Sequence, residues 1–434
     1  MKSNTGLNSK ESSNLIDHIL NKFTLDMLQN NNAAGEIFES IKQYPDHYLL
    51  NCYVASLYLY AQTDEMVLNA KNHLSVAKNQ LFLASVRGKY LFEALDNWAE
   101  GHYYSAIDHF SRLLQEFPED LLSLKYAEWL FYVIGQQFAS EQFCRLCEVI
   151  ASHHKENPYF LSVYSFALEL NGQREPAMTL AKKALSIKPD LVWAQHTVAH
   201  VHLMTGQIEV GIQFLQSMQK NWQNLVPTLK SHMNWHLGLL YVANREETLA
   251  MQLFKSAIWR ADSSVASVLV QQDAIMFLWR MAIAGMPQAD YWSIVLEKSL
   301  PNLNQFYMPF NSVNYIYLCG KNNRSDLVEQ ILNKANRHAQ TLNAVEKKVW
   351  LNVGIPFMQA VYEFSMEQYQ IAVDLMAPII AEVFCMGGSD AEDELYQMTY
   401  CCALLKLGKL DVAKQHFNQY LPHYSDSALA AYWL

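Results

Sequence analysis

The sequence predicts an all-α fold, in which antiparallel helix hairpins stack into a right-handed superhelix. Apolar residues recur at helical spacing along nearly all of the 434 residues. Alternating runs rich in Val and Ile are scarce, and only 15 Gly and 12 Pro punctuate the chain. A pattern with a period of about 34 residues also repeats along it. Since each hairpin would bury its apolar face only against its neighbours, we expect one continuous stack.

Segments 99–120 and 170–190 carry the clearest copies of the repeat. In each copy Ala follows Gly by five residues, two apolar residues come four and seven residues later, and Pro ends the pattern. The matched positions are Gly101, Ala106, Phe110, Leu113 and Pro118, and then Gly172, Ala177, Ala181, Ala184 and Pro189. Gly would turn the chain, Ala would let two helices approach closely, and Pro would begin the next hairpin. The pattern resembles the tetratricopeptide repeat and implies an α-solenoid.

The repeat also predicts how the chain is organised. Weaker copies of the pattern lie around Gly206, Ala250, Tyr369 and Gly408. Residues 1–14 are polar and are expected to be disordered, whereas residues 15–434 would form a single helical array. Residues 258–350 are helical in pattern but fit the period poorly, so irregular hairpins are expected there.

Composition and charge limit the classes of partner that we expect. The formal net charge is −10 and no run rich in Lys or Arg stands out, so we expect no nucleic-acid partner. The polar start of the chain lacks the apolar core of a signal peptide, and no stretch of about 18 apolar residues is present. We therefore expect a cytoplasmic protein without membrane insertion. The seven Cys show no disulfide framework, and the Cys144/Cys147 pair is expected to pack in a helix.

Two pairs of histidines are the candidate functional residues. His196 and His200 are four residues apart, as are His232 and His236, so each pair lies on one helix face. The pairs fall in the expected first helices of adjacent hairpins, 192–205 and 231–244. Such helices lie about 8–10 Å apart, so imidazoles from both could converge. The tetratricopeptide resemblance implies that most of these positions face the concave surface.

The histidine pairs leave three chemistries open. A step of one repeat from the second pair places Asp273 beside it. Imidazoles with a carboxylate suit Zn²⁺ or a non-haem iron, with His196, His200, His232 and His236 as the candidate ligands. Without a metal, the same histidines and Asp273 could act as acid and base near pH 7. The third possibility is that the histidines only pack or contact a ligand. The HExxH motif of zinc proteases is absent.

Four segments resemble successive signatures of the tetratricopeptide repeat protein 38 family, from about residue 85 to residue 420. They read HTVAHVHLMTGQIEVGIQFL, SHMNWHLGLLYVANREETLAMQLF, VGIPFMQA and MGGSDAEDELYQ. The resemblance implies a central site lined by polar residues, without a particular reaction. The matched residues are His196, His200, His202, His232, Asn234, Trp235, His236, Asp273, Asn311, Gly354, Pro356, Gly387, Gly388 and Ser389. The candidate ligand-binding residues are Trp193, His196, His200, His232, Asn234, Trp235, His236, Asp273, Asn311 and Ser389.

The chain also departs from the pattern of this family. Ser312 and Asn314 stand where the family has an acid and an imidazole, and Asp393 stands at a usual Arg position. These changes favour a divergent specificity or a ligand-binding remnant. Ser389 and Glu392 have the spacing of a capping box for a helix that begins near Asp390. An anionic ligand at this Gly-Gly turn is the alternative, which the three nearby acids disfavour.

Two functional hypotheses follow. The first is a binding module whose concave wall, lined by His, Trp and Asn, takes a small ligand or a peptide, and it predicts an open groove. The second is an enzyme, most simply a hydrolase, that uses the paired histidines for acid–base or metal-dependent catalysis, and it predicts convergence in a closed centre. No nucleophile elbow or phosphate loop is present.

Overall fold

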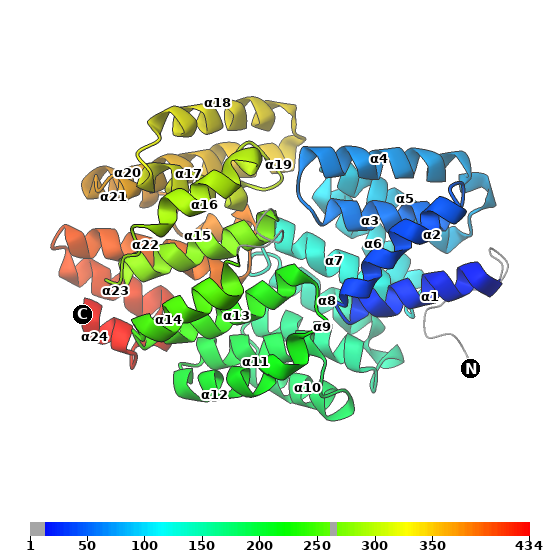
Figure 1. Cartoon of the computed structure of the whole chain (residues 1–434), viewed down its shortest axis with the longest axis horizontal. Coiled ribbons are helices and arrows are strands. Elements are labelled where there is room, and N and C mark those ends of the chain that lie inside the picture. Colours follow the sequence, from blue (N-terminus) through cyan, green and yellow to red (C-terminus); the bar gives the residue numbers. More distant parts are fainter. Residues whose placement is uncertain (1–13, 261–266) are drawn as a thin grey trace. The chain divides into compact units, whose positions relative to one another are not determined.

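A computed structural model describes residues 14–260 and 267–434. Throughout these residues the regular secondary structure is helical, apart from an isolated β-bridge between Asn31 and Leu225, which confirms the predicted all-α class. Figure 1 shows the helices in chain order. No helix in these two ranges is long and apolar enough to cross a membrane. The segment predicted to be disordered, 1–14, lies outside the described residues except for Asn14, so that prediction stays open.

The chain divides into two compact units. Unit 1 comprises residues 1–134, 139–198 and 221–226, and unit 2 comprises residues 135–138, 199–220 and 227–434. The helices of unit 1 are α1 (Asn14–Leu28), η1 (Asn32–Glu36), α2 (Ile37–Gln43), α3 (Tyr48–Leu59), α4 (Asp64–Asn79), η2 (Leu81–Leu83), α5 (Val86–Ala99), α6 (Tyr103–Glu116), α7 (Leu121–Ile134), α8 (Ser140–Ile150), η3 (Ala151–His153), α9 (Pro158–Leu170) and α10 (Arg174–Ile187). Helix α11 (Val192–Met204) belongs to unit 1 up to Val198 and to unit 2 from Ala199, and η4 (Gln219–Trp222) is also divided.

Unit 2 contains the remaining helices. They are α12 (Ile208–Met218), α13 (Pro227–Ala243), α14 (Glu247–Leu253), η5 (Phe254–Ile258), α15 (Val268–Ile283), α16 (Tyr291–Ser299), η7 (Leu300–Asn302), α17 (Pro309–Lys321), α18 (Ser325–Thr341), α19 (Ala344–Val349), η8 (Trp350–Gly354), α20 (Ile355–Ser365), α21 (Tyr369–Met376), η9 (Val383–Met386), α22 (Asp390–Lys406), α23 (Leu410–Tyr420), η10 (Pro422–Tyr424) and α24 (Ala428–Trp433). Consecutive helices pair into hairpins such as α9/α10 and α22/α23. Two π-helical turns, η5 and η8, lie near the ends of the span predicted to be irregular.

The turns of the hairpins explain the repeat. Gly101, Gly172, Gly206 and Gly408 all have a φ between 69° and 77°, the left-handed conformation that glycine adopts without steric cost. Their predicted role as turn residues is therefore confirmed. Elsewhere the same conformation is taken by Gln62, Arg245, Asn323 and Glu367. The hairpin turn thus persists at positions where the glycine of the repeat pattern is missing.

The first and second helices of the hairpins differ in burial. In α18 the buried residues are Val328, Ile331, Ala335 and Ala339, a single stripe at helical spacing. In α15, by contrast, 14 of the 16 residues are buried, so the helix is enclosed on all sides. First helices therefore hold the interior of each unit. Any polar side chain that they carry is removed from water and needs a partner.

Candidate functional site

Six titratable side chains of unit 2 form a connected cluster, which we call the imidazole–carboxylate site. Its members are His200, His232, His236, Asp273, Asp390 and Glu392. They come from α11, α13, α15 and the first turn of α22, and α15 packs against both α13 and α22. Because α22 follows α13 by well over a hundred residues, this cluster depends on how unit 2 folds back on itself.

Each of two imidazoles in the site is paired with an aspartate. His200 Nδ1 lies 3.0 Å from Asp390 Oδ1, and His232 Nδ1 lies 3.0 Å from Asp273 Oδ1. When Nδ1–H donates to the carboxylate, Nε2 becomes the basic nitrogen of the ring, and the ring orientation is fixed. The two pairs therefore hold two rings in defined tautomers. The His200 ring is fully buried, whereas the His232 side chain keeps about a fifth of its surface exposed.

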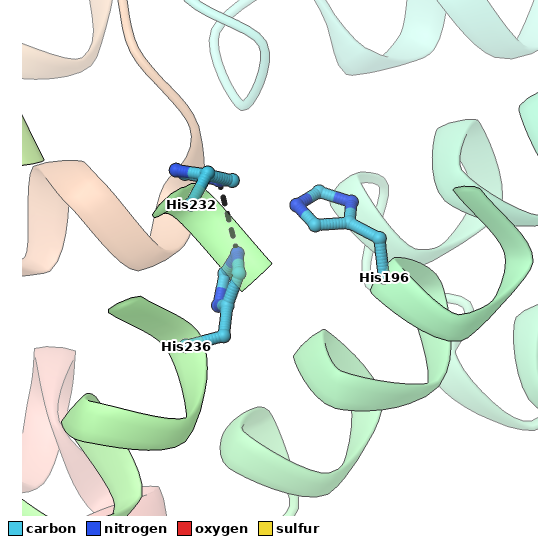
Figure 2. A group of neighbouring side chains, drawn as sticks. All are labelled: His196, His232 and His236. Carbon is cyan, nitrogen blue, oxygen red and sulfur yellow. Dashed lines mark hydrogen bonds between the residues drawn. The ribbon is translucent and has the colours of Figure 1, made fainter. Parts of the chain in front are cut away.

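His236 lies between the two pairs. Its Nε2 is 3.1 Å from Nε2 of His232, one turn earlier on α13, and Figure 2 shows the two rings joined by this contact. Its ring centroid is 4.6 Å from the centroids of both His200 and His232. Asp273, His232 and His236 thus form a continuous chain of polar contacts. A hydrogen bond between the two Nε2 atoms requires one proton, because neither nitrogen can donate without it.

Burial and charge act in opposite directions on these groups. Burial favours the neutral ring of His232, but the Asp273 carboxylate outweighs it through its charge and hydrogen bond, so the pKa of His232 is raised. Burial also raises the pKa of Asp273, against the influence of His232. Glu392 contributes to the raised pKa of His232, and one ligand atom each of His232, Asp273 and Glu392 lies within 4.8 Å of the others.

The first turn of α22 supplies the carboxylates, and a capping box defines where it begins. The Ser389 N–H donates to Glu392 Oε2 at 2.7 Å, which confirms the predicted box, and the helix begins at Asp390 as expected. Gly387 and Gly388, with φ of 104° and 101°, allow the chain to enter this turn. Asp393 is fully buried, and burial together with Glu392 and Asp390 raises its pKa far above the ordinary value.

Arg280 holds this end of α22 against α15. Its guanidinium is 3.3 Å from Glu394 Oε1 and donates to the backbone carbonyls of Ala391 and Glu392. Glu394 also accepts from Tyr424 Oη at 2.6 Å and contacts His423 Nε2 at 2.9 Å. Glu394 therefore has its own set of donors. Neither Arg280 nor these partners were predicted from the sequence, although Arg280 lies two helical turns after Asp273 on the same helix.

Two of the predicted residues belong to unit 1. The ring of His196 stacks on Trp193 with centroids 4.6 Å apart, and it meets Phe166 edge-on at 4.9 Å. Trp193 Nε1–H donates to Glu128 at 2.5 Å, and the ammonium of Lys125 lies 3.7 Å above its ring. The structure thus places Trp193 and His196 together in an aromatic cluster of unit 1. Figure 2 also draws His196, which is one turn before His200 on α11.

The remaining predicted residues have structural surroundings. Asn234 donates to the Lys230 carbonyl at 2.7 Å and accepts from Gln219 at 3.2 Å. Trp235 is fully buried, with its ring stacked on His232 at 5.2 Å, and it therefore supports that imidazole. His202 contacts Gln207 at 3.1 Å, outside the imidazole–carboxylate site. Asn311, Ser312 and Asn314 are fully buried on α17.

Gly354 and Pro356 lie at the junction of η8 and α20. Gly354 closes the π-helical turn, and a Cβ there would lie 2.8 Å from Pro309 Cβ. Pro356 is in the first turn of α20, which continues directly from the π-helical turn η8. Cys144 and Cys147 are buried on α8, as expected for packed residues. These matched residues therefore serve packing and turns.

No family model matches the sequence, so membership of the tetratricopeptide repeat protein 38 family stays a prediction. Among solved structures, the chain is similar to the human IFIT1 dimer with m7Gppp-AAAA. The match covers 87% of this chain and 90% of that chain, with 12% identity and a TM-score of 0.41. This similarity concerns the helical fold alone.

The comparison corrects one prediction. From the net charge and the lack of a basic run, we expected no nucleic-acid partner, yet the similar solved chain was captured with m7Gppp-AAAA. The exclusion is therefore wrong. Net charge is a sum over the whole chain, and it does not describe the potential inside a local pocket.

Proposed function

We propose that unit 2 is an enzyme that activates water to hydrolyse a small polar molecule at the imidazole–carboxylate site. The observation that carries the proposal is the pair of histidine–aspartate contacts, each 3.0 Å long, with His236 between them. A carboxylate on Nδ1 orients an imidazole so that Nε2 becomes the reacting atom, as acid–base catalysis requires. Imidazoles and carboxylates can activate water directly by accepting its proton.

The burial of the site supports an enzyme more than a peptide-binding groove. Asp273, Asp390 and Glu392 are each exposed by 9% or less, and α15 and α22 bury nearly all of their residues. A peptide would need an accessible row of side chains, whereas a small molecule is held in a concave pocket by a few convergent polar groups. The predicted site for a small ligand is thus retained in this proposal, with turnover added to binding.

Profiling of a polar metabolite extract tests this function. Wild-type protein and the variants His200→Gln and His236→Gln are each incubated with the extract, and masses are followed by liquid chromatography and mass spectrometry. We expect wild type to deplete a metabolite and to form products that together contain one added water. Turnover in the two variants should fall by roughly 100-fold or more, since positioned acid–base groups contribute about that much.

His202→Gln is the matched control, because His202 lies on the same helix as His200 but contacts Gln207. It should keep wild-type turnover, and circular dichroism should show equal helicity in all variants. Wild-type protein that changes no metabolite beyond heat-inactivated protein would overturn the proposal. Retention of a metabolite without its conversion would favour the binding module instead.

A further inference from the structure

The imidazole–carboxylate site brings three buried carboxyl groups beside its imidazoles. Asp273, Asp390 and Glu392 are exposed by only 3%, 9% and 2%. The nearby arginine, Arg280, forms a side-chain ion pair with Glu394. Two of these carboxylates, those of Asp390 and Asp273, contact imidazoles, which are neutral unless they take up a proton. A buried site of this kind is stabilised when a cation is bound within it.

The nitrogen atoms of the site are placed as metal ligands are. Nε2 of His232 and Nε2 of His236 are 3.1 Å apart, from positions four residues apart on one helix face. Nitrogen ligands lie about 2.0–2.1 Å from zinc, so two nitrogens at this separation can share one ion. The proton that joins the two rings in the metal-free protein would then be replaced by the cation.

The hydrogen-bond partners of the rings also match those of metal-binding histidines. Imidazoles that bind a metal through one nitrogen usually donate the other N–H to a carboxylate. Asp273 stands in this position for His232, and Asp390 does so for His200. Glu392 brings a carboxylate within 4.8 Å of His232 and receives the Ser389 N–H at Oε2, which fixes its orientation.

We propose that His232 and His236 bind one divalent transition metal, with His200 and Glu392 as the adjacent donors and with Asp273 and Asp390 as positioning residues. Imidazole donors favour zinc or iron over magnesium or calcium. The inference rests on the proposed hydrolytic function, because a metal ion lowers the pKa of its bound water to about 7 and so supplies the attacking hydroxide.

A second contact between a histidine and a carboxylate in unit 2, that of His423 with Glu394, differs from the imidazole–carboxylate site. His423 Nε2 lies 2.9 Å from Glu394, but Glu394 also receives Arg280 and Tyr424 Oη. Its negative charge is therefore already balanced by a permanent cation. The feature that selects the imidazole–carboxylate site for the metal is its pair of imidazole Nε2 atoms, 3.1 Å apart.

Elemental analysis of untagged protein, purified without chelators, tests the proposal. Metal content is measured as isolated, and again after anaerobic incubation of the metal-free protein with Zn²⁺ or Fe²⁺ and removal of the excess. We expect wild type and the control His202→Gln to hold one ion per chain. His232→Gln and His236→Gln should hold none, and the two metals tested separately distinguish zinc from iron.

The positioning residues give a graded readout. Asp273→Asn keeps the size of the side chain but removes the charge behind His232, so metal affinity should fall by about 10–100-fold while full stoichiometry returns at high metal. A purely structural role for Asp273 would leave affinity unchanged in the folded variant. Co²⁺ loading adds a spectroscopic check, because the visible bands of Co²⁺ should be lost in His236→Gln.

The outcomes separate this inference from the proposed function. Wild-type protein that binds neither zinc nor iron overturns the metal site, and turnover by that metal-free protein would leave the hydrolytic function intact. Stoichiometric metal that survives both histidine substitutions also overturns it. If metal binds as expected but no metabolite is converted, the metal site stands and the enzymatic function fails.

Discussion

Two histidines one turn apart on α11 have opposite surroundings. His196, in unit 1, lies against the rings of Trp193 and Phe166, whereas His200, in unit 2, lies against the Asp390 carboxylate and the His236 ring. The same residue type at helical spacing thus lies against aromatic rings in one place and against a carboxylate in the other. The difference shows that the neighbours of an imidazole, more than its spacing in the sequence, determine the chemistry open to it.

The largest expected effect on stability comes from Arg280→Met, because Arg280 holds the start of α22. The change leaves Glu394 and the first carbonyls of α22 without their guanidinium, so the free energy of unfolding should fall by about 3–5 kcal/mol, as when one partner of a buried ion pair is removed. Urea denaturation followed by circular dichroism measures it. Arg324→Met removes an exposed pair with Asp326 and should leave the urea midpoint unchanged. Equal losses in both variants would show that Arg280 does not hold α22.

The contrast between histidines beside aromatic rings and histidines beside a carboxylate extends to their pKa values. His416 on α23 lies between Tyr400 and Tyr420, at 4.8 and 4.7 Å, and burial lowers its pKa to about 4. Pairing with Asp273 instead raises the pKa of His232. Because the folded protein holds His416 neutral, its contribution to stability is complete above pH 6.5 and is lost as the pH falls towards 4.

This contribution can be isolated with His416→Phe. Between pH 6.5 and pH 4, the unfolding free energy of wild type should fall by about 2–3 kcal/mol more than that of the variant, which has no proton to gain. Urea denaturation at a series of pH values gives both curves. Parallel curves would show that His416 is protonated as readily in the folded protein as in the unfolded chain.

The same substitution at the two histidines of α11 sharpens the comparison directly. His200→Phe leaves Asp390 buried without its imidazole donor and should cost about 1–3 kcal/mol. His196→Phe keeps an aromatic ring against Trp193 and Phe166, so it should cost less than about 1.5 kcal/mol. Thermal denaturation compares the two. A larger loss at His196 than at His200 would show that the contact between His200 and Asp390 contributes less to stability than the ring contacts of His196.

Helix content and hairpin turns are the part of the fold that local sequence can predict. Gly101 and Gly172 identify turns because a left-handed backbone conformation strongly favours glycine. Within residues 258–350 the period is lost for a local reason also, since Asn323 adopts that conformation without being glycine. A pattern defined by glycine cannot find such turns. The division into two units depends on tertiary packing, which has no local signature.

The candidate site was only partly predictable. The spacing of His232 and His236 predicts a shared helix face, and the repeat step correctly places Asp273 near them. Asp390 pairs with His200 across 190 residues of chain, so no spacing rule connects the two. Glu392 was recognised only as a helix cap, because that role is local, whereas its proximity to His232 appears only after folding.

Ser389→Ala gives the smallest expected effect and compares two helix caps. Ser389 caps α22 beside the imidazole–carboxylate site, and Ser85 caps α5 in unit 1, where its side chain accepts from the Gly88 N–H at 3.1 Å. Loss of either hydroxyl should cost about 1 kcal/mol, the usual value for an N-cap, as measured by thermal denaturation. The backbone N–H of residue 389 still reaches Glu392 in the alanine variant, so metal content should also be kept. A loss at Ser389 well above that at Ser85, or a loss of metal, would mean that this hydroxyl belongs to the site itself.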